Sequence, residues 1–215
     1  MTDTATSGLQ IRVVDHPLTR AWLAVLRDES TPNSAFRDAL ARLAQMLVYE
    51  AFAAAPERAI EVRTPVGLAP CATLAQPPLF VPVLRAGLGM LDAAIASVPD
   101  AAIGFVGVAR DERTARPSEY LASLPDDLTG RPVCVLDPML ATGGSLVHTL
   151  DLLTARGATD ITAICVVGAP EGLEALRAWG RPLRLVIGAV DDHLNDAKFI
   201  VPGLGDAGDR QFGPR

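Results

Sequence analysis

The clearest chemical signal in the chain lies at residues 133–145, which read VCVLDPMLATGGS. An apolar run there ends on one carboxylate, Asp137, and a loop of small residues leads into a helical pattern. Two adjacent glycines, Gly143 and Gly144, let the backbone turn its N–H groups toward one point at the start of that helix. Hydroxyls flank the glycine pair at Thr142 and Ser145. This combination favours binding of a phosphate monoester.

Other phosphate loops do not match these residues. A GxxxxGK[ST] loop needs a lysine, and the chain's one lysine, Lys198, lies far away in the sequence. GxGxxG is absent here as well. A Gly-Gly pair before a helix can also be a plain turn, but the acid and the two hydroxyls favour binding.

Two arginines stand at the ends of other apolar runs. Arg85 follows residues 79–84 and is flanked by Gly87 and Gly89, which permit close approach of the backbone to a ligand. The alternative is a surface arginine that caps a strand. Arg110 follows a run over 101–109 and begins a charged stretch to residue 127, which is typical of a mobile flap or a solvated loop.

The last unusual segment is IVPGLGDAGDRQFG, residues 200–213, with four glycines and two aspartates within a dozen residues. By composition alone it could be a frayed C-terminal tail.

Apolar residues from Leu18 to about residue 55 recur at helical spacing, broken at residues 30–33, and predict an N-terminal region of two helices. Residues 1–17 read as an extended lead-in. Farther along, apolar runs alternate with helical patterns, which predicts an α/β fold with a mostly parallel sheet flanked by helices. We expect short polar strands at 58–70, strands at 79–84, 101–109, 131–136, 161–168 and 183–190, and helices at 88–98, 145–156 and 171–179. Ligands of such sheets gather at the carboxyl ends of the strands, where Arg85, Arg110 and Asp137 would meet.

The bulk composition excludes several classes. The formal charge of −6 argues against a nucleic-acid surface. Three cysteines without CxxC spacing favour neither a disulfide framework nor a zinc site. Residues 1–10 lack the apolar stretch of a signal peptide, and no run is long enough to span a membrane, so we expect a cytoplasmic protein.

Residues 136–145 resemble the PRPP-binding signature of the type I phosphoribosyltransferases, in its uracil phosphoribosyltransferase form (PRPP is 5-phosphoribosyl-1-diphosphate). Most type I members have a second acid where Pro138 stands, and the uracil branch has proline. Residues 81–90 and 200–213 are similar to two further segments of that family, in the same order, and the resemblance runs from about residue 16 to 213. It implies one domain over residues 1–215, with a flexible arm at about 110–127 and a uracil-binding segment at about 199–213.

The resemblance also implies roles for single residues. The loop from Ala141 to Ser145 would hold the 5′-phosphate, Asp137 the ribose hydroxyls, and Arg85 and Arg110 the diphosphate. The implied catalytic residues are Asp137, Arg85 and Asp206. The implied PRPP-binding set is Arg85, Arg110, Asp137, Pro138, Met139, Leu140, Ala141, Thr142, Gly143, Gly144, Ser145 and Asp206. Uracil would be read by main-chain groups of Ile200, Gly205 and Ala207, beside Asp206.

The implied reaction joins uracil to PRPP, giving UMP and diphosphate, with Mg2+ held by PRPP and water and no direct protein ligand. Implied partners are the two substrates, GTP as an effector, and further copies of the chain in a homodimer or higher oligomer; no nucleic acid or membrane is expected. No general base is identified: His16, His148 and His193 lie outside the motifs and are expected to be structural.

Three departures and three rival functions stay open. Ala109, Arg113 and Phe199 stand where the family commonly has an aromatic, a glutamate and a tyrosine. The rivals are transfer to another base such as a purine, an RNA-binding regulator that keeps the fold, and a homologue without activity. The glycine-rich segment at 203–209 argues against a purine, and the acidic charge argues against RNA.

Overall fold

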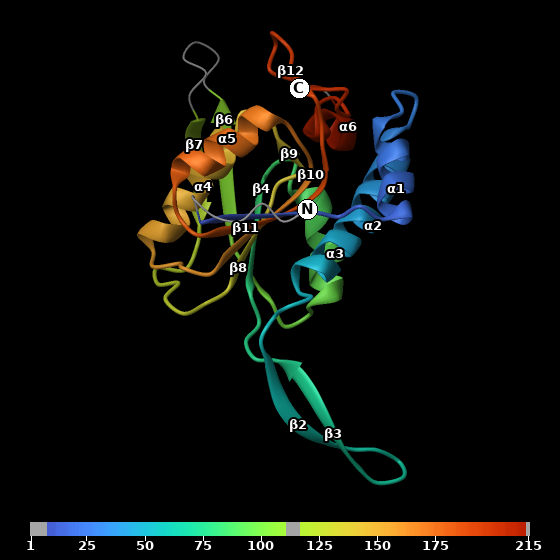
Figure 1. Cartoon of the computed structure of the whole chain (residues 1–215), viewed down its shortest axis with the longest axis vertical. Coiled ribbons are helices and arrows are strands. Elements are labelled where there is room, and N and C mark those ends of the chain that lie inside the picture. Colours follow the sequence, from blue (N-terminus) through green and yellow to red (C-terminus); the bar gives the residue numbers. More distant parts are fainter. Residues whose placement is uncertain (1–7, 111–116, 214–215) are drawn as a thin grey trace.

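The computed structural model describes residues 8–110 and 117–213, and its centre is a mostly parallel sheet (Figure 1). The strand order is β1-β11-β10-β8-β4-β6-β7, with short β5 beside β4 and short β9 beside β10. The strands are β1 Leu9–Val13, β4 Leu79–Leu84, β5 Ala102–Ile103, β6 Phe105–Arg110, β7 Pro117–Ser123, β8 Val133–Leu136, β9 Met139–Leu140, β10 Ile161–Gly168 and β11 Leu183–Val190. Among the described strands of this sheet, only β6 and β7 pair antiparallel. The expected fold class is confirmed.

The central strands are almost wholly apolar because both faces of the sheet are covered. All residues of β8 and β10 are buried, and so are the first five of β4. A sheet with one wet face would alternate apolar and polar residues instead. The bounds predicted from the sequence for β4, β10 and β11 are therefore confirmed.

Two helical layers cover the sheet, as Figure 1 shows with α4 and α5 on one side and the other helices opposite. The helices are α1 Pro17–Arg27, α2 Asn33–Ala51, α3 Leu88–Ser97, α4 Gly144–Ala155, α5 Pro170–Trp179 and α6 Ala207–Phe212. The two N-terminal helices are confirmed. His16 has the structural role expected of it, since its Nδ1 accepts the Leu18 N–H at 3.2 Å and caps α1.

The structure differs from the sequence prediction at several segments, and the run at 101–109, expected as one strand, is two strands, β5 and β6. Part of the extended lead-in is an edge strand, β1, which pairs parallel with β11. The short polar strands expected near 58–70 are longer than predicted: β2 Glu57–Arg63 and β3 Leu68–Leu74 form a long hairpin that extends away from the body of the molecule (Figure 1). The second half of the charged stretch is strand β7, while residues 111–116 of the expected arm lie outside the described residues.

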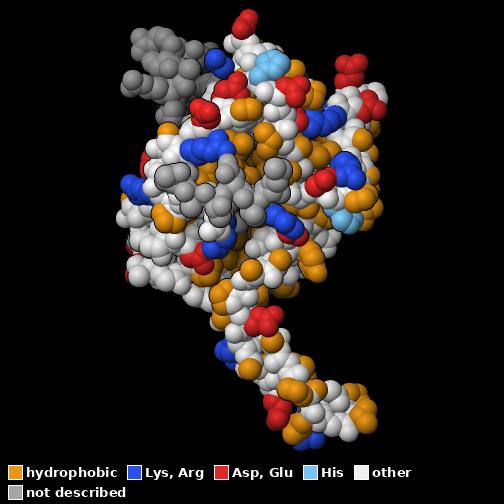
Figure 2. Space-filling model, viewed as in Figure 1, with side chains coloured by type: hydrophobic (Ala, Val, Ile, Leu, Met, Phe, Trp, Pro, Cys, Tyr) orange, Lys and Arg blue, Asp and Glu red, His pale blue; other side chains and the backbone are white. Residues whose placement is uncertain are grey.

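Exposed apolar side chains gather around the tip of the β2–β3 hairpin (Figure 2). Val66, in the turn, is 97% exposed, and Val62 and Leu68 beside it are exposed too. Such a surface is unusual on a hairpin with no layer packed on either face. Within the described residues, no helix is long and apolar enough to cross a membrane.

Candidate active site

A cavity of about 580 Å³ opens at the carboxyl ends of β4 and β8. It brings together the segments that the sequence singled out, although they are up to about 120 residues apart in the chain. Of the predicted site residues, the following line it: Arg85, Asp137, Met139, Ala141, Thr142, Gly143, Gly144, Ser145, Ile200, Asp206 and Ala207. The convergence follows from topology, because β8 and β4 are parallel neighbours whose ends meet at one edge.

The wall formed by residues 141–145 is the start of helix α4. Gly143 has φ of 79°, a left-handed conformation, and a Cβ there would lie 2.7 Å from the Cβ of Ala175. The Gly144 N–H points toward Thr142 Oγ1 at 3.5 Å. The first N–H groups of a helix lack acceptors within the helix and carry the positive end of its dipole. The loop can therefore bind a phosphate, as the glycines and hydroxyls predict.

Two predicted residues, Pro138 and Leu140, do not line the cavity and instead fix the loop to the sheet. The Pro138 carbonyl oxygen accepts from the N–H groups of Val166 and Val167, both at 3.1 Å. The Leu140 carbonyl oxygen accepts from Ala169 N–H at 2.9 Å, and its side chain is buried. These residues set the position of the phosphate loop without facing the cavity.

Asp137 sits at the end of β8 with only 8% of its surface exposed. Burial raises the pKa of this carboxyl to about 7, because the charged form loses its hydration. The Met139 N–H, 3.3 Å from Oδ1, opposes the rise only in part. The free site thus holds a carboxyl that is partly protonated near neutral pH.

Arg85 directly follows β4, and the Leu84–Arg85 peptide bond is cis. Its Nη2 lies 3.3 Å from Asp209 Oδ1, and a third of its side chain is exposed. The nearby glycines have a structural role in addition to the one expected. A Cβ on Gly87 would collide with the Leu136 carbonyl oxygen, and one on Gly89 with the Gln211 side chain, so both glycines allow close packing within the protein.

The segment at 200–213 is folded and not a frayed tail. Ile200 belongs to β13, Ile200–Val201, which pairs with β12, His193–Leu194. Asp206 accepts the Asp209 N–H at 2.9 Å and caps α6. Ala207 is buried and lines the cavity, whereas Gly205, with φ of 78°, adjoins the cavity without lining it.

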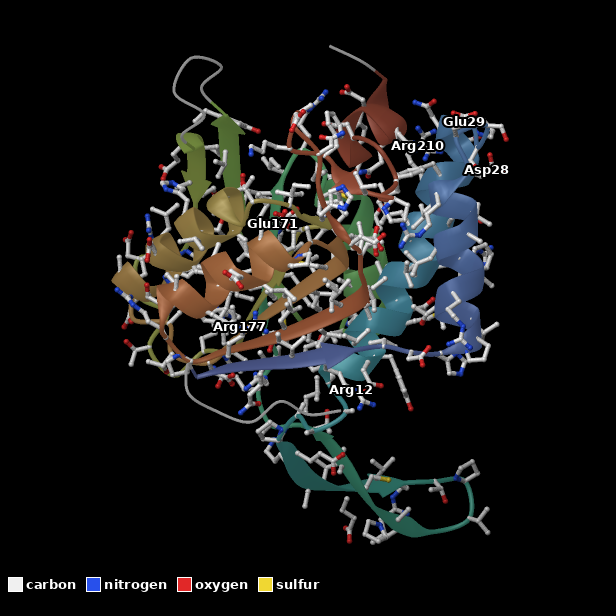
Figure 3. The ribbon with its side chains drawn as sticks, turned by 45° about the horizontal axis from the view of Figure 1, so that its top comes forward. Arg12, Asp28, Glu29, Glu171, Arg177 and Arg210 are labelled. Carbon is white, nitrogen blue, oxygen red and sulfur yellow. The ribbon has the colours of Figure 1, made fainter. Side chains whose placement is uncertain are left out.

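Two side chains of α6 anchor it to neighbouring elements. Gln211 is buried, and its Nε2 donates to the carbonyls of Ala86 at 3.0 Å and Ala207 at 2.7 Å. Arg210 donates to the carbonyls of Leu26 and Asp28, both at 2.6 Å, so it reaches the end of α1 (Figure 3). The N-terminal helices thereby support the segment expected to read the base.

Arg110, Lys198 and Asp209 also lie in or near the cavity region. Arg110 is the last residue of β6, at the expected sheet edge, and its side chain lies outside the described part. Lys198 and Asp209 line the cavity but were not predicted. Both lie in or beside the glycine-rich run, and Lys198 has φ of 66°, a conformation that its sequence gives no signal of. Neither His148 nor His193 is among the lining residues.

The fold is that of the type I phosphoribosyltransferases. A hypoxanthine-guanine phosphoribosyltransferase from Bacillus anthracis shares the fold, with a TM-score of 0.50 and 14% identity over 74% of this chain and 79% of that one. The AQ2163 protein from Aquifex aeolicus is far more similar, with a TM-score of 0.88 and 38% identity over 94% of this chain and 98% of that chain.

The particular branch follows from sequence. The family model for uracil phosphoribosyltransferase matches residues 13–214. Uracil phosphoribosyltransferases from Corynebacterium diphtheriae and Corynebacterium efficiens are 56% and 52% identical to the chain, each over 96% of it and 98% of the relative. The chain belongs to the uracil phosphoribosyltransferase family.

The raised pKa of Asp137 predicts how stability depends on pH. Between about pH 4 and 7 the native state keeps a proton that the unfolded state has lost, so this carboxyl makes the protein less stable as pH rises through that window. Asp137→Asn cannot lose a proton. Its free energy of unfolding relative to wild type should therefore increase from pH 4 to pH 8, by on the order of 4 kcal/mol at most.

Urea unfolding at several pH values measures this difference. Asp100→Asn, at an exposed position, is the control for loss of one negative charge. A difference between Asp137→Asn and wild type that stays constant with pH would contradict the raised pKa.

Proposed function

We propose that the chain transfers the phosphoribosyl group of PRPP to N1 of uracil, forming UMP and diphosphate. The observation that carries the proposal is the shared cavity: the phosphate loop at 141–145, Asp137 and the segment around Ala207 line one space. A nucleoside monophosphate has the same three parts, namely phosphate, ribose and base. Family membership supports the same reaction.

In this proposal the protein acts by positioning and electrostatics. The loop at 141–145 holds the 5′-phosphate, and Asp137 binds the ribose hydroxyls. Arg85 faces the leaving diphosphate, with Arg110 expected to join it. As the C1–oxygen bond breaks, positive charge develops on the ribose, and the carboxylates of Asp137 and Asp206 favour it. N1 of uracil then forms the new bond and loses its proton.

Base choice is assigned to main-chain groups of Ile200, Gly205 and Ala207. Uracil presents alternating acceptors and N–H donors, which a backbone segment in a fixed conformation can match. Cytosine places an amino donor where uracil has an acceptor, so a buried donor would face a donor. Such a mismatch discriminates far more strongly than a missing methylene group.

The donor set of the cavity fits Mg2+. Asp206 and Asp209 supply carboxylate oxygens on one side of the cavity, the ligand type that Mg2+ prefers. No group of three or more metal-binding side chains occurs among the described residues, so most ligands would be substrate oxygens and water. When bound, Mg2+ would neutralise charge on the leaving diphosphate.

The test is UMP formation from PRPP and Mg2+, with uracil, cytosine, hypoxanthine and adenine offered separately. We expect turnover with uracil alone, and we expect Asp137→Asn to lower it by orders of magnitude while the protein stays folded. Turnover with a purine would show that the chain transfers the phosphoribosyl group to a purine, and the assignment of uracil would be wrong. Binding of PRPP without turnover of any base would point to the regulator or to a homologue without activity.

We further propose that the chain works as one cytoplasmic domain and as a homodimer. The main sheet takes its strands from residues between 9 and 190, so most of the chain belongs to one sheet, as a single domain requires. The β2–β3 hairpin supports assembly, because no residue that the structure describes covers its apolar tip. A response to GTP rests on the resemblance alone.

Light scattering at working concentration tests the assembly. A mass of two chains or more is expected, and it should fall when Val66 and Leu68 at the hairpin tip are both changed to Ser. A wild-type mass of one chain would contradict the homodimer.

A further inference from the structure

We infer that Arg27 and Asp191 are positioning residues for the uracil-reading segment. Neither residue lines the active-site cavity, and neither belongs to the motifs that mark the site. They act through the backbone of Gly203, which lies between the base-reading residues Ile200 and Ala207. The inference rests on the proposed function and extends it to residues outside the cavity.

The contact is a closed set of four short hydrogen bonds. The Arg27 guanidinium binds the Asp191 carboxylate as a fork, with Nη1–Oδ2 at 2.7 Å and Nη2–Oδ1 at 2.6 Å. Arg27 Nη1 also donates to the Gly203 carbonyl oxygen at 2.8 Å. Asp191 Oδ2 in turn accepts the Gly203 N–H at 2.9 Å. The ion pair therefore holds both polar backbone groups of one residue.

Gly203 is the point at which the segment turns. Its φ is 61°, and a Cβ there would collide with the Ile200 carbonyl oxygen, so the chain folds tightly back on itself. Holding Gly203 at both its N–H and its carbonyl fixes the orientation of the peptide groups on either side. The directions of the Ile200 and Gly205 backbone groups depend on this turn.

The ion pair ties that turn to the rigid part of the fold. Asp191 follows β11 directly, and its N–H donates to the Gly168 carbonyl oxygen at the end of β10, at 2.8 Å. Arg27 is the last residue of α1. The Asp191 side chain is 5% exposed and that of Arg27 is 27% exposed, so solvent screens the pair little. A fork of this kind fixes geometry as well as charge.

Arg210 also reaches the segment, through the Leu204 carbonyl at 3.1 Å, but its contacts differ in kind. It mainly holds carbonyls of residues 26 and 28 and stacks on Phe36, with its guanidinium carbon 4.6 Å from the ring centre. Changing it would loosen the junction of α1 and α2. Arg27 and Asp191 are therefore the cleaner test of positioning.

The expected kinetic signature separates the two substrates. The phosphate loop and Asp137 belong to other elements than Gly203, and Asp206 is held separately by its hydrogen bond with the Asp209 N–H, so the KM for PRPP should rise much less than the KM for uracil. The KM for uracil should rise by about tenfold or more in Arg27→Met and Asp191→Asn, and the preference for uracil over cytosine should fall. Arg27→Lys keeps the charge but loses the fork, so its KM for uracil should lie between those of wild type and Arg27→Met.

Arg20→Met is the matched control. Arg20 lies two turns earlier on the same helix and pairs with Asp15, but both side chains are mostly exposed. Removing it deletes an arginine and an ion pair from α1 without touching Gly203. Both KM values should stay at the wild-type level.

Hydrogen exchange of the substrate-free proteins provides the second readout, independent of activity. The Gly203 N–H should exchange faster in Asp191→Asn and Arg27→Met than in wild type and Arg20→Met, whereas N–H groups inside α4 should exchange at one rate in all four. Exchange that becomes faster by the same factor at Gly203 and inside α4, or a rise in the KM for PRPP equal to that for uracil, would overturn the inference by showing general destabilisation. If the wild-type protein does not use uracil, the proposed function is wrong. The exchange experiment still tests the ion pair in that case, because faster exchange confined to Gly203 in the variants would show that the pair orders the turn.

Discussion

Parallel pairing of β4 and β8 is the constraint on which the rest of the site depends. Because the two strands run side by side in the same direction, Arg85 and Asp137 leave the sheet at one edge. The same edge receives the phosphate loop, since β8 leads through β9 into α4. Covering both faces of the sheet with helices then leaves this edge as the place where a ligand can enter. The buried carboxyl of Asp137 is a direct result, and its raised pKa follows from that position.

The opposite wall of the cavity, formed by the C-terminal segment, is held by side-chain contacts and not by the sheet. The segment at 200–213 contains only β13 and the short helix α6, and it is held in place both by its own side chains and by side chains of other elements. Gln211 joins α6 to the loop after β4, Arg210 joins it to the end of α1, and Arg27 with Asp191 fixes the turn at Gly203. In the proposed function, the N-terminal helices thus contribute to base recognition through this segment. Loss of any one of these anchors should act on the base side of the cavity first.

Much of this arrangement could be predicted from the sequence, and the reasons are local. Buried strands such as β10 are continuous apolar runs, and Gly143-Gly144 after a lone aspartate marks a helix start suited to phosphate. The missed features depend on distant contacts. β1 is a strand only because β11 offers it a free edge, and the partners of Gly87 and Gly89 come from Leu136 and Gln211. Neither Lys198, on the cavity wall, nor the pair of Arg27 with Asp191 carries a spacing signal, since the fold alone places them.

A crystal structure of the complex with UMP tests the central claim most directly, namely that one cavity binds phosphate at the α4 start and pyrimidine at the C-terminal segment. The account predicts the phosphate within hydrogen-bond distance of backbone N–H groups in residues 142–145, the ribose hydroxyls at Asp137, and the pyrimidine edge on main-chain groups between Ile200 and Ala207. A phosphate bound elsewhere, or a pyrimidine with no contact to that segment, would contradict it.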